Sequence, residues 1–552
     1  MRLYSLKKCL RIRRVLVFVV IFVLVTTGIK MKDFLKMNNN DYDNDNSGMI
    51  IKKYELYKYV GKTFTVGLFL KNQSPGNTTY CNFRLGDSVT FNYTDNDVSY
   101  SPELGEKGPY RILYSVVKGF QYNNTETNSV TYVTHITLEF LFHIVEIAKR
   151  WSGPISVACF LPGTDTILAL KVLEKMCFCV KEMENVDIHF IYPKDHPPKL
   201  MSLKNYSFWL DMEEYNIYTP WKMIETNSVQ KTSDNNNNNN NTYINDNKTN
   251  IKTTTTTSAT TNTYEGTCYV PEKILKNSYK SKKNLVYPIN VARNVARYGS
   301  RSKFILVSDI ELLPSDNLVN EFLNMIKRLN EKNKHLGEHY FTKKKHVYVL
   351  PVFEVSETEP DVPRTKSQLL DLYEKERAVY FHRYICTHCQ RFPGIQRWLQ
   401  RKVHPRIKTG TIQPLLVVKR EFPYHRWEPI YIGTNNEPLY SELLTWEGQQ
   451  DKMTQMHEMC LLEYRFVILN GAFLVHTPGI KRRHIVKKNT KLLLKKGNLN
   501  SIVITNHSSS KVTTDINSAQ KNAHMKRNSY LYQIITQDVM GRYKFNPRCR
   551  IH

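Results

Sequence analysis

Residues 302–311 read SKFILVSDIE, an apolar run that ends in two carboxylates one residue apart, Asp309 and Glu311. Such a run predicts a buried central strand. Side chains just beyond the carboxyl end of a central strand lie where open α/β sheets bind ligands. Two carboxylates placed there can hold a divalent cation against a diphosphate, such as that of a nucleotide sugar. The stretch therefore predicts an enzyme that acts on sugars, with a metal site after this strand.

The segment before this strand predicts a helix that carries two arginines. Residues 287–297 read YPINVARNVAR, with one apolar face and with Arg293 and Arg297 stacked four residues apart. Guanidiniums beside a metal-bound diphosphate would bind phosphate or a sugar carboxylate in bidentate fashion. The alternative is a solvated helix face. A second helix is predicted over residues 318–329, which puts the carboxylate pair on a loop between strand and helix.

Strands and helices also alternate nearer the N-terminus. Residues 131–134, 155–161 and 186–192 have the pattern of strands, whereas 138–148 and 167–177 have the pattern of helices. Alternation of this kind predicts an α/β protein with a parallel, doubly wound sheet.

Composition narrows the class of protein. The chain has 552 residues, of which 41% are apolar and 12% aromatic, enough for a sizeable core. Its formal net charge of +28 indicates an anionic partner. We expect no nucleic-acid binding, because the basic residues are dispersed and the chain is expected to be lumenal.

The N-terminus predicts a membrane anchor. Residues 15–29 are almost continuously apolar and follow a basic segment, 1–14, which the positive-inside rule places in the cytosol. We expect a type II signal anchor that also tethers the protein to the membrane. A cleaved signal peptide and a buried helix are the alternatives.

Sequons and cysteines agree with a lumenal location. N-glycosylation sequons stand at Asn77, Asn92, Asn123, Asn205, Asn247 and Asn506. Nine of the ten cysteines follow the anchor, so disulfides are expected and at least one thiol is left free or pairs between chains. The motif Cys386-Thr387-His388-Cys389 fits a zinc site less well than a disulfide or free thiols, because no second ligand pair is evident.

The lumenal part divides into a stem and a catalytic domain. Residues 30–105 are polar and predict a stem, and residues 106–550 predict a single catalytic domain. Two low-complexity or basic segments, about 227–263 and about 487–526, predict disordered insertions in that domain.

Several motifs together resemble glycosyltransferase family 49, in the order seen there. The resemblance covers roughly residues 110–550 without the insertions, and its motifs lie at 134–137, 150–158, 287–297, 304–315, 427–432, 440–455, 473–476 and 530–549. It implies a GT-A fold, a Rossmann-like doubly wound sheet, with a UDP-sugar donor, Mn2+ or another divalent cation, and inverting transfer.

The resemblance also implies roles for individual residues. The metal ligands would be Asp309, Glu311 and His476, although a lone His at a strand end is otherwise more often a core residue. Glu311 departs from the Asp of better-known members and adds one methylene. The donor would be bound by Thr134, Asn290, Arg293, Arg297 and Ser308.

The general base is less well defined, because this chain departs from the family where the base is expected. An inverting transfer needs a base within hydrogen-bond reach of the acceptor hydroxyl. The candidates are Glu447, Asp451 and Glu442.

The expected function is that of a Golgi type II membrane glycosyltransferase. It would transfer glucuronate from UDP-glucuronate to a protein-linked glycan acceptor such as an O-mannosyl glycan, and a partner glycosyltransferase would be needed for any polymer. One alternative is a beta-1,3-N-acetylglucosaminyltransferase that uses UDP-N-acetylglucosamine. The other is a catalytically inactive glycan-binding protein on the same scaffold.

Overall fold

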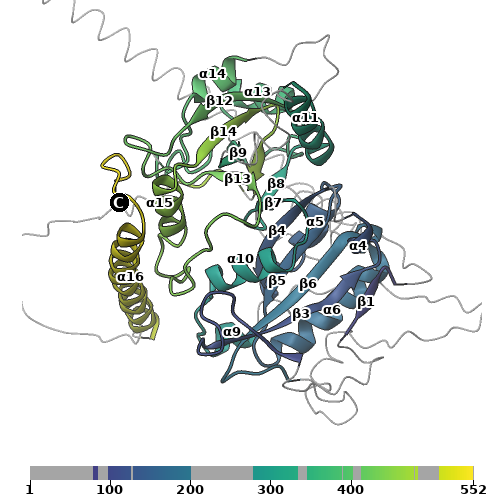
Figure 1. Ribbon diagram of the computed structural model, residues 1–552. Helices are drawn as coiled ribbons and strands as arrows, with labels where there is room; N and C mark the ends of the chain where they lie inside the picture. The colour runs from purple at the N-terminus through teal and green to yellow at the C-terminus, as the bar shows by residue number, and fades with distance from the viewer. Residues whose placement is uncertain are drawn as a thin grey trace, which may run out of the picture. The chain divides into compact units, whose positions relative to one another are not determined.

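The computed structural model describes residues 79–84, 97–125, 129–199, 278–332, 345–387, 389–401, 412–477, 479–482 and 509–550 (Figure 1). The expected tail, the anchor at 15–29 and the insertion at 227–263 lie outside these residues. None of the helices within the described ranges is long and apolar enough to cross a bilayer.

The protein is a mixed α/β fold built on a large sheet, as predicted. The strand order is β1 (Cys81–Phe83), β3 (Tyr110–Gly119), β6 (Val186–Pro193), β5 (Ile155–Phe160), β4 (Val130–Thr137), β7 (Phe304–Val307), β13 (Ile430–Gly433), β9 (His346–Leu350), β14 (Arg465–Asn470) and β12 (Gln413–Val418), and β2 (Ser99–Tyr100) pairs with β3. The four central strands β6, β5, β4 and β7 are parallel. Outside them the sheet is mixed, because β3 is antiparallel to β6 and β13 is antiparallel to β7 and β9, whereas β9 and β14 are again parallel.

Helices on the two faces explain why the central strands read as continuous apolar runs. Every residue of β4 and β5 is buried. The apolar side of α10 (Ile289–Tyr298) packs on β4 and β5 through residues such as Val291 and Val295. Burial on both faces selects apolar residues at every position rather than at alternate ones.

Other elements are the helices α4 (Tyr122–Thr125), α5 (His143–Ala148), α6 (Asp165–Cys179), α9 (Tyr279–Lys282), α11 (Leu318–Lys332), α13 (Lys366–Glu374), α14 (Ile395–Gln400), α15 (Met453–Leu461) and α16 (Ser509–Arg542), and the 3-10 turns η2 (Leu138–Phe140) and η3 (Lys181–Asn185).

A small second sheet joins the segment after β7 to the C-terminal third of the chain. Its strand order is β11 (Ala378–Tyr380), β10 (Val352–Val355), β15 (Leu474–His476) and β8 (Leu312–Pro314). β8 follows Glu311 directly, so the carboxylate pair leads into a strand before α11 begins. Antiparallel pairing of β8 with β15 sets Leu312 opposite His476.

The structure differs from two of the expected segments, the stem and the second insertion. β1 and β2 lie within residues 30–105 and pair with β3, so the fold begins before the expected end of the stem. The Cys81–Cys177 disulfide ties β1 to the end of α6. Residues 509–526, expected to be disordered, form the first half of α16. The rest of that insertion, up to 508, lies outside the described residues.

All described cysteines except Cys159 form disulfides. Besides Cys81–Cys177, the pairs include Cys386–Cys389 and Cys460–Cys549. The Cys-Thr-His-Cys motif is therefore a disulfide and not a zinc site. Cys159 is free and buried in β5, where burial raises its thiol pKa.

Candidate active site

Asp309 lies where the order of the parallel strands reverses. β4 is followed along the chain by β5 and β6 on one side, whereas β7 pairs on the other side of β4. Ligands of open α/β sheets bind at the carboxyl ends of the strands at such a switch point. Because Val133 lies opposite Val307 in this parallel pair, His135 comes beside Asp309 two residues further on.

Three nitrogen-bearing side chains surround the Asp309 carboxylate. Oδ1 lies 3.2 Å from His135 Nε2 and 3.1 Å from Arg293 Nη2, and Oδ2 lies 2.9 Å from Lys452 Nζ. Burial alone would raise the pKa of Asp309, but Lys452, His135 and Arg293 together hold it well below its ordinary value. The carboxylate is therefore ionised at every physiological pH.

Glu311 faces His476 across the pairing of β8 with β15. His476 Nε2 lies 3.2 Å from Glu311 Oε2, and Thr477 N donates to the Glu311 carbonyl at 3.2 Å. Burial lowers the pKa of His476 in spite of Glu311, so the imidazole is neutral near pH 7. Burial would raise the pKa of Glu311, but the hydrogen bond from His476 and the charge of Lys481 contribute to keeping it below its ordinary value.

The donor set of these three side chains suits a hard divalent cation, although the geometry is not that of a preformed site. Two carboxylates and an imidazole are common ligands of Mn2+. Within the described ranges, no three His, Cys, Asp or Glu side chains are grouped closely enough to hold a metal. Lys452 is paired with Asp309, and Glu311 and His476 are paired with each other.

Two residues of α10 join Asp309 to a second carboxylate. Arg293 is buried and donates through Nη2 to Asp309 and through Nη1 to Asp451. Asn290 accepts from Arg293 at 2.9 Å and donates to the carbonyls of Ser441 and Asp451, each at 2.8 Å. The helix therefore holds the 441–452 segment against the end of β7.

Comparison with known proteins identifies the family. Residues 129–507 match Glyco_transf_49, the family described as "Glycosyl-transferase for dystroglycan". The chain belongs to glycosyltransferase family 49. The match spans the central strands, α10, the carboxylate pair and His476.

Several curated proteins that are similar to this family 49 member have glucuronyltransferase in their names. Beta-1,4-glucuronyltransferase 1 of Danio rerio is 24% identical over 67% of this chain and 72% of its own length. The Homo sapiens protein of that name is 23% identical over 81% of this chain and 82% of its own length. Human xylosyl- and glucuronyltransferase LARGE1 is 23% identical over 37% of this chain and 24% of its own. The protein is thus a glycosyltransferase.

Arg297, the second arginine of α10, lies away from the carboxylate pair. Arg297 is buried, and its guanidinium donates to the carbonyls of Pro438 at 2.8 Å, Glu437 at 2.7 Å and Asn435 at 3.3 Å. It was expected to bind the donor beside Arg293. The structure separates the two guanidiniums. Arg297 lies one helical turn further along α10, where its guanidinium meets the backbone of residues 435–438 and not Asp309.

We expect Arg297→Met to lower stability and leave the donor KM unchanged. The substitution removes three charge-assisted hydrogen bonds from a buried guanidinium to backbone carbonyls, which should cost about 2–4 kcal/mol of unfolding free energy. Urea unfolding and donor saturation curves measure the two effects. A rise in donor KM without loss of stability would contradict this structural role.

The three candidate bases are in different surroundings. Glu447 Oε1 accepts from Tyr287 N at 3.0 Å, and its other oxygen is buried without a hydrogen-bond partner in the part of the chain that the structure describes. Asp451 is paired with Arg293. Glu442 lies apart from the site and accepts from Leu104 N and Asn294 Nδ2, and burial raises its pKa. Among the described residues, Glu447 is the one candidate of the three with a buried side-chain oxygen that has no hydrogen-bond partner.

The two predicted hydroxyl ligands, Thr134 within β4 and Ser308 directly after β7, are both buried. Thr134 in β4 is fully buried, and its hydroxyl has no partner among the described residues. Ser308 N donates to Val133 O at 3.0 Å, and Ser308 Oγ lies 3.4 Å from the Asp309 carbonyl. Ser308 precedes Asp309 in the chain, and Thr134 lies in the neighbouring strand of the sheet. Neither side chain is exposed.

Three residues of the network were missing from the sequence prediction. His135 and Lys452 contact Asp309 directly, and the Tyr287 hydroxyl lies 2.8 Å from His135 Nδ1. All three lie within or next to the family motifs. A sequence signal was available for Lys452, which directly follows Asp451, but nothing local indicates that its ammonium reaches a carboxylate 143 residues away.

Proposed function

We propose that this protein transfers glucuronate from UDP-glucuronate to a protein-linked glycan such as an O-mannosyl glycan, with inversion at the anomeric carbon. The observation that carries the proposal is the pair Asp309 and Glu311 at the switch point of the sheet, with His476 brought to Glu311 by β15. The names of the relatives support glucuronate as the sugar.

Asp309, Glu311 and His476 would hold a divalent cation such as Mn2+. When bound, the cation would stabilise the negative charge that develops on the departing diphosphate. The ionised carboxylates and the neutral imidazole are in the protonation states that ligation needs. With the cation bound, Asp309 would give up its contact with Lys452, and the Lys452 ammonium would be free to bind a phosphate oxygen of the donor.

Glu447 is the candidate general base. Its second carboxylate oxygen is buried without a partner among the described residues, and it would accept a proton from an acceptor hydroxyl that displaces the atoms now covering it. Trp446 beside it is 61% exposed, so its indole ring can stack on a sugar of the acceptor. Arg293 orients Asp309 and Asp451 through its two ion pairs.

The proposed location is the Golgi lumen, behind a single type II anchor. The disulfides Cys81–Cys177, Cys386–Cys389 and Cys460–Cys549 support an oxidising compartment. The acceptor glycan, and any polymerising partner enzyme, would be met there.

A donor panel tests the proposal. The purified lumenal part is incubated with xylose-terminated acceptors and UDP-glucuronate, UDP-N-acetylglucosamine or UDP-xylose, with and without Mn2+. We expect turnover with UDP-glucuronate only, and only with the metal. Turnover with UDP-N-acetylglucosamine instead would overturn the donor. If transfer with every donor is absent and an Asp309→Ala, His476→Ala variant still binds glycan, the protein is a binding protein on this scaffold.

A further inference from the structure

A short loop next to the candidate active site is held by a side chain of the C-terminal helix. The loop, residues 445–450, carries Trp446 and Glu447 and leads into Asp451 and Lys452. Asn528 of α16 is 2% exposed and spans the loop. Its Nδ2 donates to the carbonyls of Thr445 at 2.8 Å and Gln449 at 3.0 Å, and its Oδ1 lies 3.4 Å from Thr445 N.

The loop is shaped to admit this side chain. A Cβ on Gly448 would lie 2.1 Å from Asn528 Cγ, so no larger residue fits there while Asn528 keeps its place. Gln449 and Gln450 both have positive φ, 61° and 57°, which costs energy for residues other than glycine. A strained loop of this kind keeps its conformation only where the surrounding contacts impose it.

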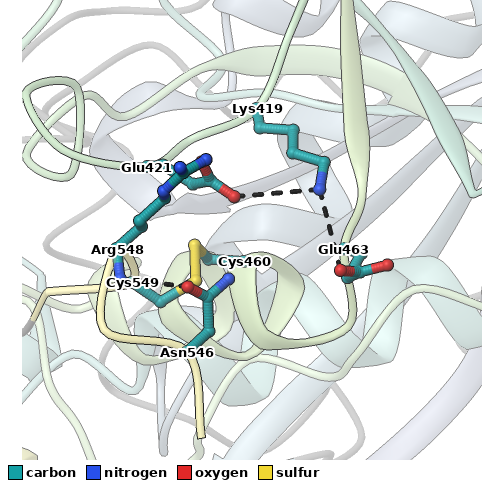
Figure 2. The surroundings of a disulfide bond; sticks show 7 residues. All are labelled: Lys419, Glu421, Cys460, Glu463, Asn546, Arg548 and Cys549. Carbon is teal, nitrogen blue, oxygen red and sulfur yellow. Dashed lines mark hydrogen bonds and ion pairs between the residues drawn. A yellow bond between two sulfur atoms is a disulfide. The ribbon is translucent and has the colours of Figure 1, made fainter.

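α16 is itself fixed to the catalytic domain. Asn528, Tyr532, Thr536 and Val539 are buried and lie on one face, and α16 packs against α15. The Cys460–Cys549 disulfide joins the segment after α16 to α15, and Arg548 lies 3.6 Å from Glu421 (Figure 2). The Tyr543 hydroxyl donates to Glu458 at 2.6 Å. Asn528 is therefore presented by an anchored helix.

The contacts of the loop connect Asn528 to the active site. Trp446 and Glu447 contact the backbone of Tyr287, whose hydroxyl reaches His135 beside Asp309. From these contacts we infer that Asn528 is a positioning residue, which holds Trp446 and Glu447 in place for the acceptor. The inference rests on the proposed function, because that function makes Glu447 the base and Trp446 the acceptor platform.

The donor side of the site should not depend on Asn528. Asp451 and Lys452 follow the loop but have their own contacts with Asn290, Arg293 and Asp309. Loss of Asn528 should therefore change acceptor parameters and leave donor parameters unchanged. A loss of folded protein would instead lower the apparent kcat and leave both KM values unchanged.

Asn528→Ala tests this inference, with Gln533→Ala as the control, an exposed amide on the same helix. We expect Asn528→Ala to reduce kcat/KM for the acceptor about tenfold to a hundredfold, with a raised acceptor KM and with the donor KM unchanged within about twofold. Asn528→Asp should be as damaging, because a carboxylate cannot donate to the two loop carbonyls. Gln533→Ala should match the wild type.

Gly448→Ala gives a second variant from the loop side, should Asn528→Ala fold poorly. Its Cβ would displace the loop from Asn528, so the same selective loss for the acceptor is expected. Equal losses in donor and acceptor parameters in both variants, or no loss in either, would overturn the inference.

Hydrogen exchange separates this inference from the proposed function. We expect amides of residues 445–450 to exchange at least about tenfold faster in Asn528→Ala than in wild type. Unchanged exchange would overturn the inference even if the enzyme is a glucuronyltransferase. A wild-type protein with no transfer activity would overturn the proposed function. Faster exchange in Asn528→Ala would in that case still support the role of Asn528 in holding the loop.

Discussion

Asp309→Asn should reduce sugar transfer by about a thousandfold or more, since it removes a charged ligand from the proposed metal site. The substitution also leaves Arg293 and Lys452 beside a neutral amide, although both now contact the carboxylate at 3.1 Å or less. Repulsion between these two cations should lower the stability as well. Steady-state transfer rates and urea unfolding measure the two effects.

Asp316→Asn is the matched control for this substitution. Asp316 lies seven residues further on and pairs at 3.1 Å with Arg364, and both side chains are more than two-fifths exposed. Exposed ion pairs contribute about 0–1 kcal/mol, so transfer and stability should stay close to wild type. Transfer by Asp309→Asn at a tenth of the wild-type rate or more would rule out a metal ligand at this position.

Replacement of Cys460 and Cys549 by Ala should lower the free energy of unfolding by about 2–4 kcal/mol. The bond closes a sequence separation of 89 residues, so its loss restores much freedom to the unfolded chain. It also releases the segment after α16, which should lower transfer through the loop at 445–450. Denaturant unfolding without reductant, together with acceptor kinetics, tests both effects.

The Cys386–Cys389 bond provides the comparison. Its sequence separation is 3 residues, so the same loop-entropy argument predicts a loss of only about 1–2 kcal/mol for the double Ala variant. If the two pairs cost the same, chain entropy would not be the reason that the longer one stabilises the fold.

The local patterns predicted the central strands and helices well. Residues 155–161 and 186–192 form β5 and β6 within one residue, and the helix predicted before Asp309 is α10. Burial on both faces gave these strands apolar runs, and α10 has a clear apolar face. The antiparallel strands β13 and β3 were not predicted, because pairing direction depends on distant partners and leaves no trace in the period of a strand.

Only part of the candidate site could be predicted, because contacts between distant segments leave no local signal in the sequence. Asp309 and Glu311 could be found because they directly follow a strand. Arg293 lies at the site and Arg297 does not, since neighbours along one helix face can meet different parts of the fold. The hydrogen bonds of Asn528 to the loop at 445–450 could not be predicted, because nothing in the neighbouring sequence of a polar helix indicates that this Asn is buried.

The sequence by itself determined the order of the elements, the family and the carboxylate pair at the end of β7, because periodicity and motif spacing are local properties of the chain. Only the tertiary structure decided which charges surround that pair. His135 and Lys452 lie 174 and 143 residues from Asp309 along the chain. They meet it because the parallel pairing of β4 and β7 and the hold of α10 on residues 441–452 bring distant segments to one edge of the sheet.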